Sequence, residues 1–156
     1  MTRKLFSSSI LVTIAFAAVS FCSAQSRAEL EVYDLVNRER SHARLRNLAW
    51  DDRLGRLARD YSRQMARRGF FDHYDPEGRT VTDRARALRI SNWSSIGENL
   101  FFCEAHPYFT QSAVRGWLKS RSHRTNMLDR TWTATGVGIA TARDGSIYIT
   151  QVFTHE

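Results

Sequence analysis

Three short runs in the sequence carry the residue types that could do chemistry. Phe71-Asp72-His73 supplies one imidazole, Gly97-Glu98-Asn99-Leu100 supplies a carboxylate, and the run from Trp117 to Arg124 supplies a second imidazole, His123. Two imidazoles and a carboxylate can coordinate a divalent metal, transfer a proton or bind a polar ligand. The residue types alone do not choose among these three uses.

The metal interpretation and a structural interpretation both fit these residues. With His73, His123 and Glu98 as ligands, Zn²⁺ would keep a fourth position open for water, whose pKa would fall to about 7 and support hydrolysis. Zinc or another divalent metal is thus the candidate cofactor. In the alternative, Glu98 holds the loops together by accepting hydrogen bonds from an imidazole and from backbone N–H groups. Tyr148 is a fourth candidate, either a wall of the site or a core side chain.

Other catalytic motifs are missing from the sequence. It has no serine in a nucleophile elbow, no HExxH pair and no glycine-rich phosphate loop. Serine hydrolysis and nucleotide chemistry are therefore poor interpretations.

The N-terminus has the pattern of a signal peptide over residues 1–24. Arg3 and Lys4 precede an apolar stretch that is short for a membrane span, and Cys22-Ser23-Ala24 provides small residues for cleavage before Gln25. We expect cleavage after Ala24 rather than lipidation of Cys22, because the bulky Phe21 stands where lipoprotein signals have a small residue. The remaining residues, 25–156, are predicted to form one secreted or periplasmic domain with no transmembrane segment.

The net charge indicates which partners the protein could bind, and the cysteine content indicates whether it can form disulfides. Loss of Arg3 and Lys4 lowers the formal charge by two, from +7 to +5, and leaves Lys119 as the last lysine in an arginine-rich chain. This charge suits anionic envelope polymers or lipid head groups, but arginines on the outside of a helix explain much of it. No arginine and aromatic interleaving points to a nucleic acid. After cleavage Cys103 is the single cysteine, so no internal disulfide can form.

Apolar spacing predicts the helices that position the candidate residues. Val32, Leu35 and Val36 begin the pattern of one helix, and a second runs through residues 54–65, capped by Asp51 or Asp52 and ended by Gly69. A short helix is expected over about 82–88. Another, over residues 113–118, should stop near Ser120 and leave His123 just beyond its C-terminal end, where the protonated imidazole is favoured.

The end of the chain has the pattern of a β-hairpin. Asp144-Gly145 separates two β-rich runs, at 136–140 and 147–154. Along the second run, apolar side chains point to both faces of the expected strand. This pattern indicates a central strand covered on both sides. We therefore predict an α+β fold, a three-layer α-β-α sandwich with a mainly antiparallel central sheet.

Seven motifs in order resemble the compact bacterial branch of the CAP superfamily, which comprises cysteine-rich secretory proteins, antigen 5 and pathogenesis-related 1. They are Val36-Asn37-Arg38-Glu39-Arg40, Leu48-Ala49-Trp50-Asp51, Phe71-Asp72-His73, Gly97-Glu98-Asn99-Leu100, Trp117 to Asn126, Gly136-Val137-Gly138, and Tyr148-Ile149-Thr150-Gln151-Val152-Phe153. The resemblance covers essentially all of residues 25–156. It implies an α-β-α sandwich with a cleft lined by a tetrad of histidines and glutamates.

The resemblance assigns residues to that cleft one at a time. His73 matches the first family histidine, and Glu98 matches the glutamate of the Gly-Glu-Asn motif. His123 stands where eukaryotic members have a second glutamate, and Tyr148 stands where they have a second histidine. Metal binding known for the eukaryotic arrangement therefore does not transfer automatically. The eukaryotic disulfides are absent as well.

The expected function is a ligand-binding or interaction module at the cell envelope, with His73, Glu98, His123 and Tyr148 lining the cleft. The alternative is a metal-assisted hydrolase that uses the same cleft. The ligand could be a small molecule, a lipid, a glycan or a peptide, and a monomer is assumed.

Overall fold

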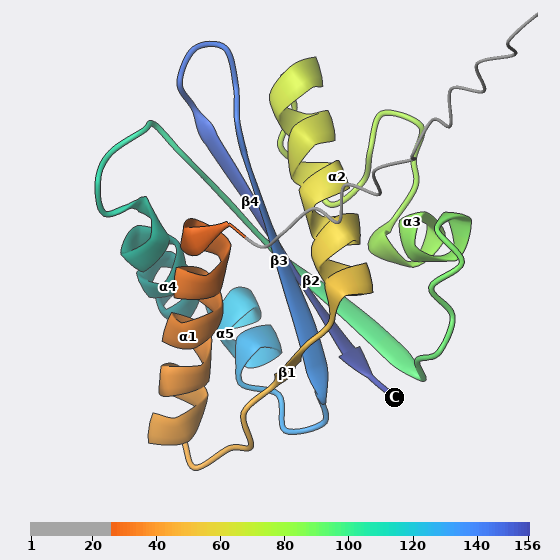
Figure 1. The fold of residues 1–156 in the computed structure, drawn as a ribbon, viewed down its shortest axis with the longest axis vertical. Helices are drawn as coiled ribbons and strands as arrows, with labels where there is room; N and C mark the ends of the chain where they lie inside the picture. Colours follow the sequence, from red (N-terminus) through yellow and green to blue (C-terminus); the bar gives the residue numbers. More distant parts are fainter. Residues whose placement is uncertain (1–25) are drawn as a thin grey trace, which may run out of the picture.

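The computed structural model describes residues 26–156, so the predicted signal peptide and its cleavage site lie outside the described part. These residues form five helices and four strands (Figure 1). The helices are α1 (Arg27–His42), α2 (Asp52–Arg68), α3 (Val81–Ala87), α4 (Phe109–Lys119) and α5 (Arg121–Met127), and the strands are β1 (Ala49–Trp50), β2 (Ser95–Cys103), β3 (Ala134–Thr141) and β4 (Ile147–His155). Within 26–156 no helix is both long enough and apolar enough to cross a membrane.

The sheet has the order β1-β3-β4-β2 and is mixed. β4 pairs antiparallel with both β3 and β2, whereas the short β1 runs parallel to β3. The predicted hairpin joins β3 to β4, with Gly145 at a φ of 88° in the turn. The predicted central strand is therefore confirmed as β4, and β2 lies at an edge of the sheet.

Helices cover both faces of the sheet, as the predicted three-layer sandwich requires. In Figure 1, α1 and α4 lie to the left of the strands and α2 and α3 to the right. One core cluster joins α1 and α4 to side chains such as Ile149 and Phe153 of β4, and the clusters under α2 contain Tyr148 and Val152. Trp117 of α4 is 1% exposed, and its indole N–H donates to the carbonyl of Leu100 at 2.9 Å.

Helix α2 lies directly on the backbone of β3 because two glycines face it. A β-carbon at Gly136 would lie 2.1 Å from the backbone nitrogen of Gly55, and one at Gly138 would lie 2.0 Å from the backbone nitrogen of Arg59. Real side chains never approach so closely, so only glycine fits at these positions. No side-chain layer separates α2 from β3 there.

The ends of α2 agree with the predicted capping residues. The Asp51 carboxylate accepts hydrogen bonds from the backbone N–H groups of Arg53 and Leu54 at 2.7 and 3.4 Å. Gly69 adopts the left-handed conformation, with a φ of 68°, and its N–H donates to the carbonyl of Met65. The chain therefore leaves α2 at a defined point just before Phe71 and His73.

The predicted end of the Trp117 helix near Ser120 is confirmed, but a second helix, which the sequence did not predict, follows at once and carries His123. Ser120 has extended backbone angles, ends α4 and immediately begins α5. His123 is therefore the third residue of a new helix, close to its N-terminal end. The helix-dipole argument for a protonated His123 fails for this reason.

Candidate functional site

Glu98 and His73 form the centre of the candidate site. Glu98 comes from edge strand β2 with a side chain 3% exposed, and its Oε1 lies 2.9 Å from Nδ1 of His73. Because a carboxylate only accepts hydrogen bonds, Nδ1 must carry the proton. In the neutral ring this leaves the Nε2 lone pair of His73 for another group, and the His73 side chain is 49% exposed.

Arg84 of α3 binds the second carboxylate oxygen of Glu98. Its guanidinium donates to Glu98 Oε2 at 2.7 Å, and it also donates to the backbone carbonyls of His73 at 3.2 Å and Arg79 at 2.8 Å. The guanidinium lies 3.3 Å from the ring centroid of Tyr61, a cation–π contact. Both carboxylate oxygens of Glu98 are therefore bonded inside the protein.

Sequence analysis missed Arg84, although the sequence holds a signal for it. Val81, Arg84 and Ala85 follow the i, i+3, i+4 spacing of a buried helical stripe. A charged residue on such a stripe needs a buried partner of opposite charge. Glu98 is that partner, and the pair is almost completely buried.

Other side chains fix the loop that carries His73. The Tyr61 hydroxyl donates to the carbonyl of Asp72, and burial raises the pKa of that hydroxyl well above its usual range, with the charge of Arg84 acting against this shift. Asp75 accepts from the backbone N–H groups of Glu77 and Arg79. The loop is therefore held on both sides of His73.

His123 reaches the same place from the opposite layer. The ring centroids of His123 and His73 lie 6.4 Å apart, and Nδ2 of Asn99 donates to the carbonyl of His123 at 3.0 Å. Asn126, also in α5, donates to the Glu98 carbonyl at 3.1 Å and to Asn99 Oδ1 at 3.0 Å. Burial, and then the charge of His73, lower the pKa of His123, which favours its neutral form.

Tyr148 joins the site through aromatic contacts. Its buried ring lies 4.9 Å from the ring of Phe102 and 6.5 Å from that of Phe71, and the two phenylalanine rings lie 5.8 Å apart. Phe71 is 48% exposed and Phe102 is 43% exposed. We call Phe71, Phe102 and Tyr148 the aromatic patch.

The predicted three-ligand zinc set does not fit the arrangement of these side chains. Among residues 26–156 no three His, Cys, Asp or Glu side chains are grouped so that they could hold a metal ion. Glu98 would have to give up its bonds to His73 and Arg84 before it could bind one. Metal binding by His73, His123 and Glu98 stays a prediction.

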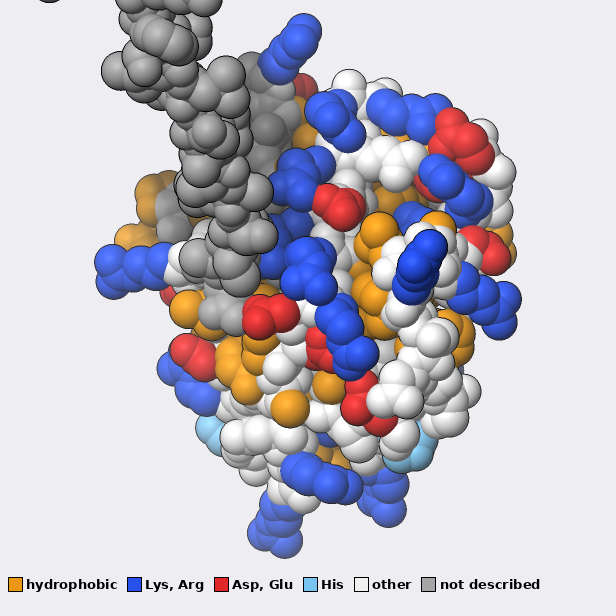
Figure 2. Space-filling model, turned by 45° about the vertical axis from the view of Figure 1, so that its right-hand side comes forward, with side chains coloured by type: hydrophobic (Ala, Val, Ile, Leu, Met, Phe, Trp, Pro, Cys, Tyr) orange, Lys and Arg blue, Asp and Glu red, His pale blue; other side chains and the backbone are white. Residues whose placement is uncertain are grey.

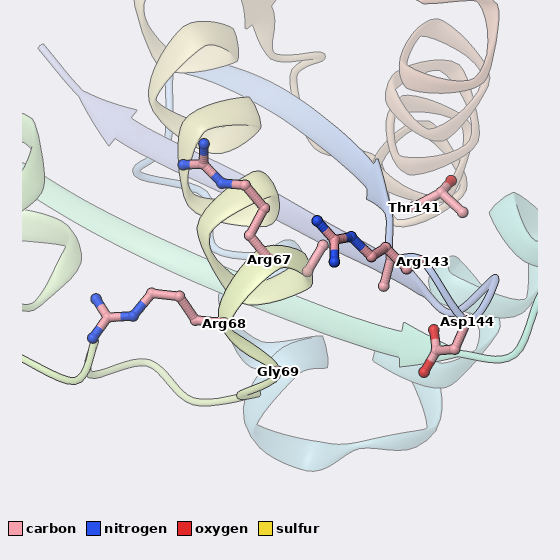
Figure 3. Close-up of a pocket in the computed structure, with 8 residues that line it drawn as sticks. Arg67, Arg68, Gly69, Thr141, Arg143 and Asp144 are labelled. Carbon is pink, nitrogen blue, oxygen red and sulfur yellow. The ribbon is translucent and has the colours of Figure 1, made fainter.

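The largest hollow among those described lies elsewhere, between the end of α2 and the β3–β4 hairpin. It has a volume of about 650 Å³ and is lined by residues that include Arg67, Arg68, Arg143 and Asp144. In Figure 3 Arg143 extends toward α2, whereas Arg68 points away, in agreement with its hydrogen bond to Glu77. These arginines do not converge on one point, and none of the lining residues belongs to the His73 site.

The arginines of α2 mainly balance nearby acidic side chains. Arg53 pairs with Asp51, Arg63 with Asp60, and Arg68 with Glu77. Figure 2 shows basic and acidic side chains interleaved over the face it presents. The interpretation of these arginines as a solvated helix face therefore accounts for the exposed ones. It is wrong for Arg59, which is 5% exposed and pairs with the buried Glu29.

The motifs and the fold together match a known family. A family model for the cysteine-rich secretory protein family, CAP, matches residues 33–153. The chain belongs to the CAP family. The resemblance found in the sequence is confirmed.

Relatives of this CAP domain occur in bacteria. YkwD of Bacillus subtilis is 33% identical over 129 residues, which are 83% of this chain and 48% of YkwD. The membrane protein YlbC of the same organism is 30% identical over 116 residues, 74% of this chain and 32% of YlbC. The chain thus spans about half or less of the curated relatives it matches.

Solved structures of related proteins share this fold. An extracellular protein of Bacillus anthracis that contains an SCP domain is 31% identical with a TM-score of 0.71, over 83% of this chain and 40% of that chain. An outer surface protein of Borrelia burgdorferi has a TM-score of 0.74 at 19% identity, over 85% of this chain and 96% of that chain.

Proposed function

We propose that this CAP domain is a secreted or periplasmic module that binds a polar ligand of the cell envelope through His73 and His123. Two structural neighbours are described as an extracellular and an outer surface protein, and the N-terminal pattern of residues 1–24 agrees with export. The observation that carries the proposal is the engagement of both Glu98 oxygens, which orients His73 while its Nε2 remains available.

In this proposal each residue of the site has a distinct part in binding. Glu98 fixes the tautomer and the orientation of His73, as carboxylates do for histidines that bind a ligand. Arg84 holds Glu98 in place through its hydrogen bond to Oε2. The two imidazoles offer the ligand hydrogen-bonding nitrogen atoms from both sides of the edge strand.

The same contacts weigh against the metal-assisted hydrolase. A general base or metal ligand needs a free carboxylate oxygen, whereas Glu98 is 3% exposed and bonded to a guanidinium. A binding site does not need that oxygen. Zinc binding by His73 and His123 is a separate question, which elemental analysis of protein purified without chelator addresses.

The test is cosedimentation of residues 25–156 with isolated bacterial envelope fractions. We expect His73→Ala to weaken binding at least fivefold because it removes the oriented imidazole. His42→Ala is the matched control, since His42 is an exposed histidine on α1. Equal binding by the wild type and by His73→Ala would contradict the proposal. Release of soluble fragments from the envelope by the wild type, and not by His73→Ala, would instead support hydrolysis.

A further inference from the structure

We propose that the aromatic patch is a stacking subsite for a sugar ring, so that the ligand of the site is a short envelope oligosaccharide. This inference rests on the proposed function and names the class of ligand. Its elements are the exposure of Phe71 and Phe102, the rigidity of their support, and their position relative to His73.

Exposure sets the two phenylalanines apart from core residues. Each leaves nearly half of its surface open to solvent, while Tyr148 beneath them is buried. Contiguous exposed apolar side chains can mark interaction sites, whereas apolar residues scattered singly over a surface need no explanation. We therefore interpret the aromatic patch as a contact surface for a ligand.

The scaffold holds this surface in a fixed geometry. Phe102 of β2 and Tyr148 of β4 are directly paired across the two antiparallel strands, and their rings lie 4.9 Å apart. Phe71 lies in the loop after α2. The backbone carbonyl of the next residue, Asp72, accepts a hydrogen bond from the Tyr61 hydroxyl. Aromatic rings supported by strands lose little entropy when a ligand stacks on them.

The position of the patch continues the His73 site along β2. Glu98 and Phe102 are four residues apart and point to the same face of the strand, so their α-carbons are separated by about 13 Å. Phe71 precedes His73 by two residues on the neighbouring loop. A ligand that reaches both the imidazoles and the patch must therefore be longer than one sugar ring.

The chemistry of the two parts favours a glycan over a lipid. A sugar ring presents a face of C–H groups to an aromatic ring and hydroxyl groups at its rim to the imidazoles. An acyl chain needs an enclosing apolar groove, and none of the hollows described in residues 26–156 is lined by the patch. The exposed rings of Phe71 and Phe102, tilted by 44° to each other and with polar groups beside them, suit the sugar.

The experiment titrates the folded protein, residues 25–156, with defined oligosaccharides and follows binding by calorimetry and by NMR of the aromatic rings. The probes are the tetramers and the monomers of N-acetylglucosamine and of glucose, with octanoate as the acyl probe. We expect at least one tetramer to bind, its monomer to bind at least tenfold more weakly, and the ring signals of Phe71, Phe102 and Tyr148 to shift.

Phe102→Ala should lower tetramer affinity at least tenfold, and Phe102→Tyr should restore most of it because it keeps a ring for stacking. Leu30→Ala is the matched control, since Leu30 is a partly exposed apolar residue on α1. Circular dichroism checks that each variant is folded. Unchanged tetramer binding by Phe102→Ala would overturn the subsite.

Further outcomes separate this inference from the proposed function. If envelope binding depends on His73 while neither tetramer binds, the sugar subsite is refuted and the proposed function stands. Binding of octanoate at the patch in preference to both tetramers would also refute it. If a tetramer binds and Phe102→Ala abolishes this while envelope binding is absent, the subsite stands and the envelope function fails.

Discussion

Replacing Glu98 with Gln should destabilise the fold measurably, although the two side chains have nearly the same size. The substitution removes the negative charge that faces Arg84 at 2.7 Å, where the two side chains are 3% and 7% exposed. Removing one partner of a buried ion pair typically costs about 3–5 kcal/mol because the other charge stays buried. Arg84 keeps two carbonyl acceptors and the Tyr61 ring, so we expect a smaller loss, about 2–3 kcal/mol.

The assay is urea unfolding at pH 7 of the wild type, Glu98→Gln, Arg84→Met and the double variant. The double variant should lose less than the sum of the two single variants, because no unpaired charge remains buried. Glu77→Gln is the matched control: it removes the same group from an ion pair with Arg68 whose side chains are nearly half exposed. That change should cost at most about 1 kcal/mol. Losses from Glu98→Gln as small as those from Glu77→Gln would refute the reasoning.

Four further predictions concern Trp117 in the core, His123, Gly138 and the N-terminus. Trp117→Ala should lower the free energy of unfolding by about 3–5 kcal/mol in urea, since the indole is buried and hydrogen-bonded. The lowered pKa of His123 means that its contribution to stability is fully present above the unfolded value of about 6.5 and is lost as pH falls below it. His123→Gln should therefore flatten the fall in stability as the pH drops below about 6.5. Gly138→Ala should force α2 away from β3, lowering the melting temperature well beyond the effect of Ala140→Gly. N-terminal sequencing of exported protein should begin at Gln25; a chain that retains Met1 would contradict the signal peptide.

Local patterns in the sequence predict most of the fold. Alternation along residues 147–154 indicates a strand buried on both faces, and β4 is central. Asp51 and Gly69 mark the two ends of α2 by their capping chemistry. These signals are reliable here because each depends on neighbours within a few residues.

The parts of the site that sequence analysis missed depend on contacts between distant segments. The pairing of Arg84 with Glu98 joins α3 to β2, and the contact of Phe71 with Phe102 joins a loop to an edge strand. The helix α5, which begins directly after Ser120, was missed because the apolar pattern of α4 indicates only where α4 ends. The grouping of His73 with His123 was expected only from the family resemblance.

The direct contact between α2 and β3 has a consequence for how far the site tolerates change. Where side chains separate two elements, a mutation can be absorbed by repacking, but at Gly136 and Gly138 the backbones themselves touch. Any added atom must then displace the whole helix, and the loop with Phe71 and His73 begins at the far end of that helix. The direct backbone contact at Gly136 and Gly138 thus fixes the distance between α2 and the sheet. A substitution at either glycine should therefore move Phe71 and His73 together with α2.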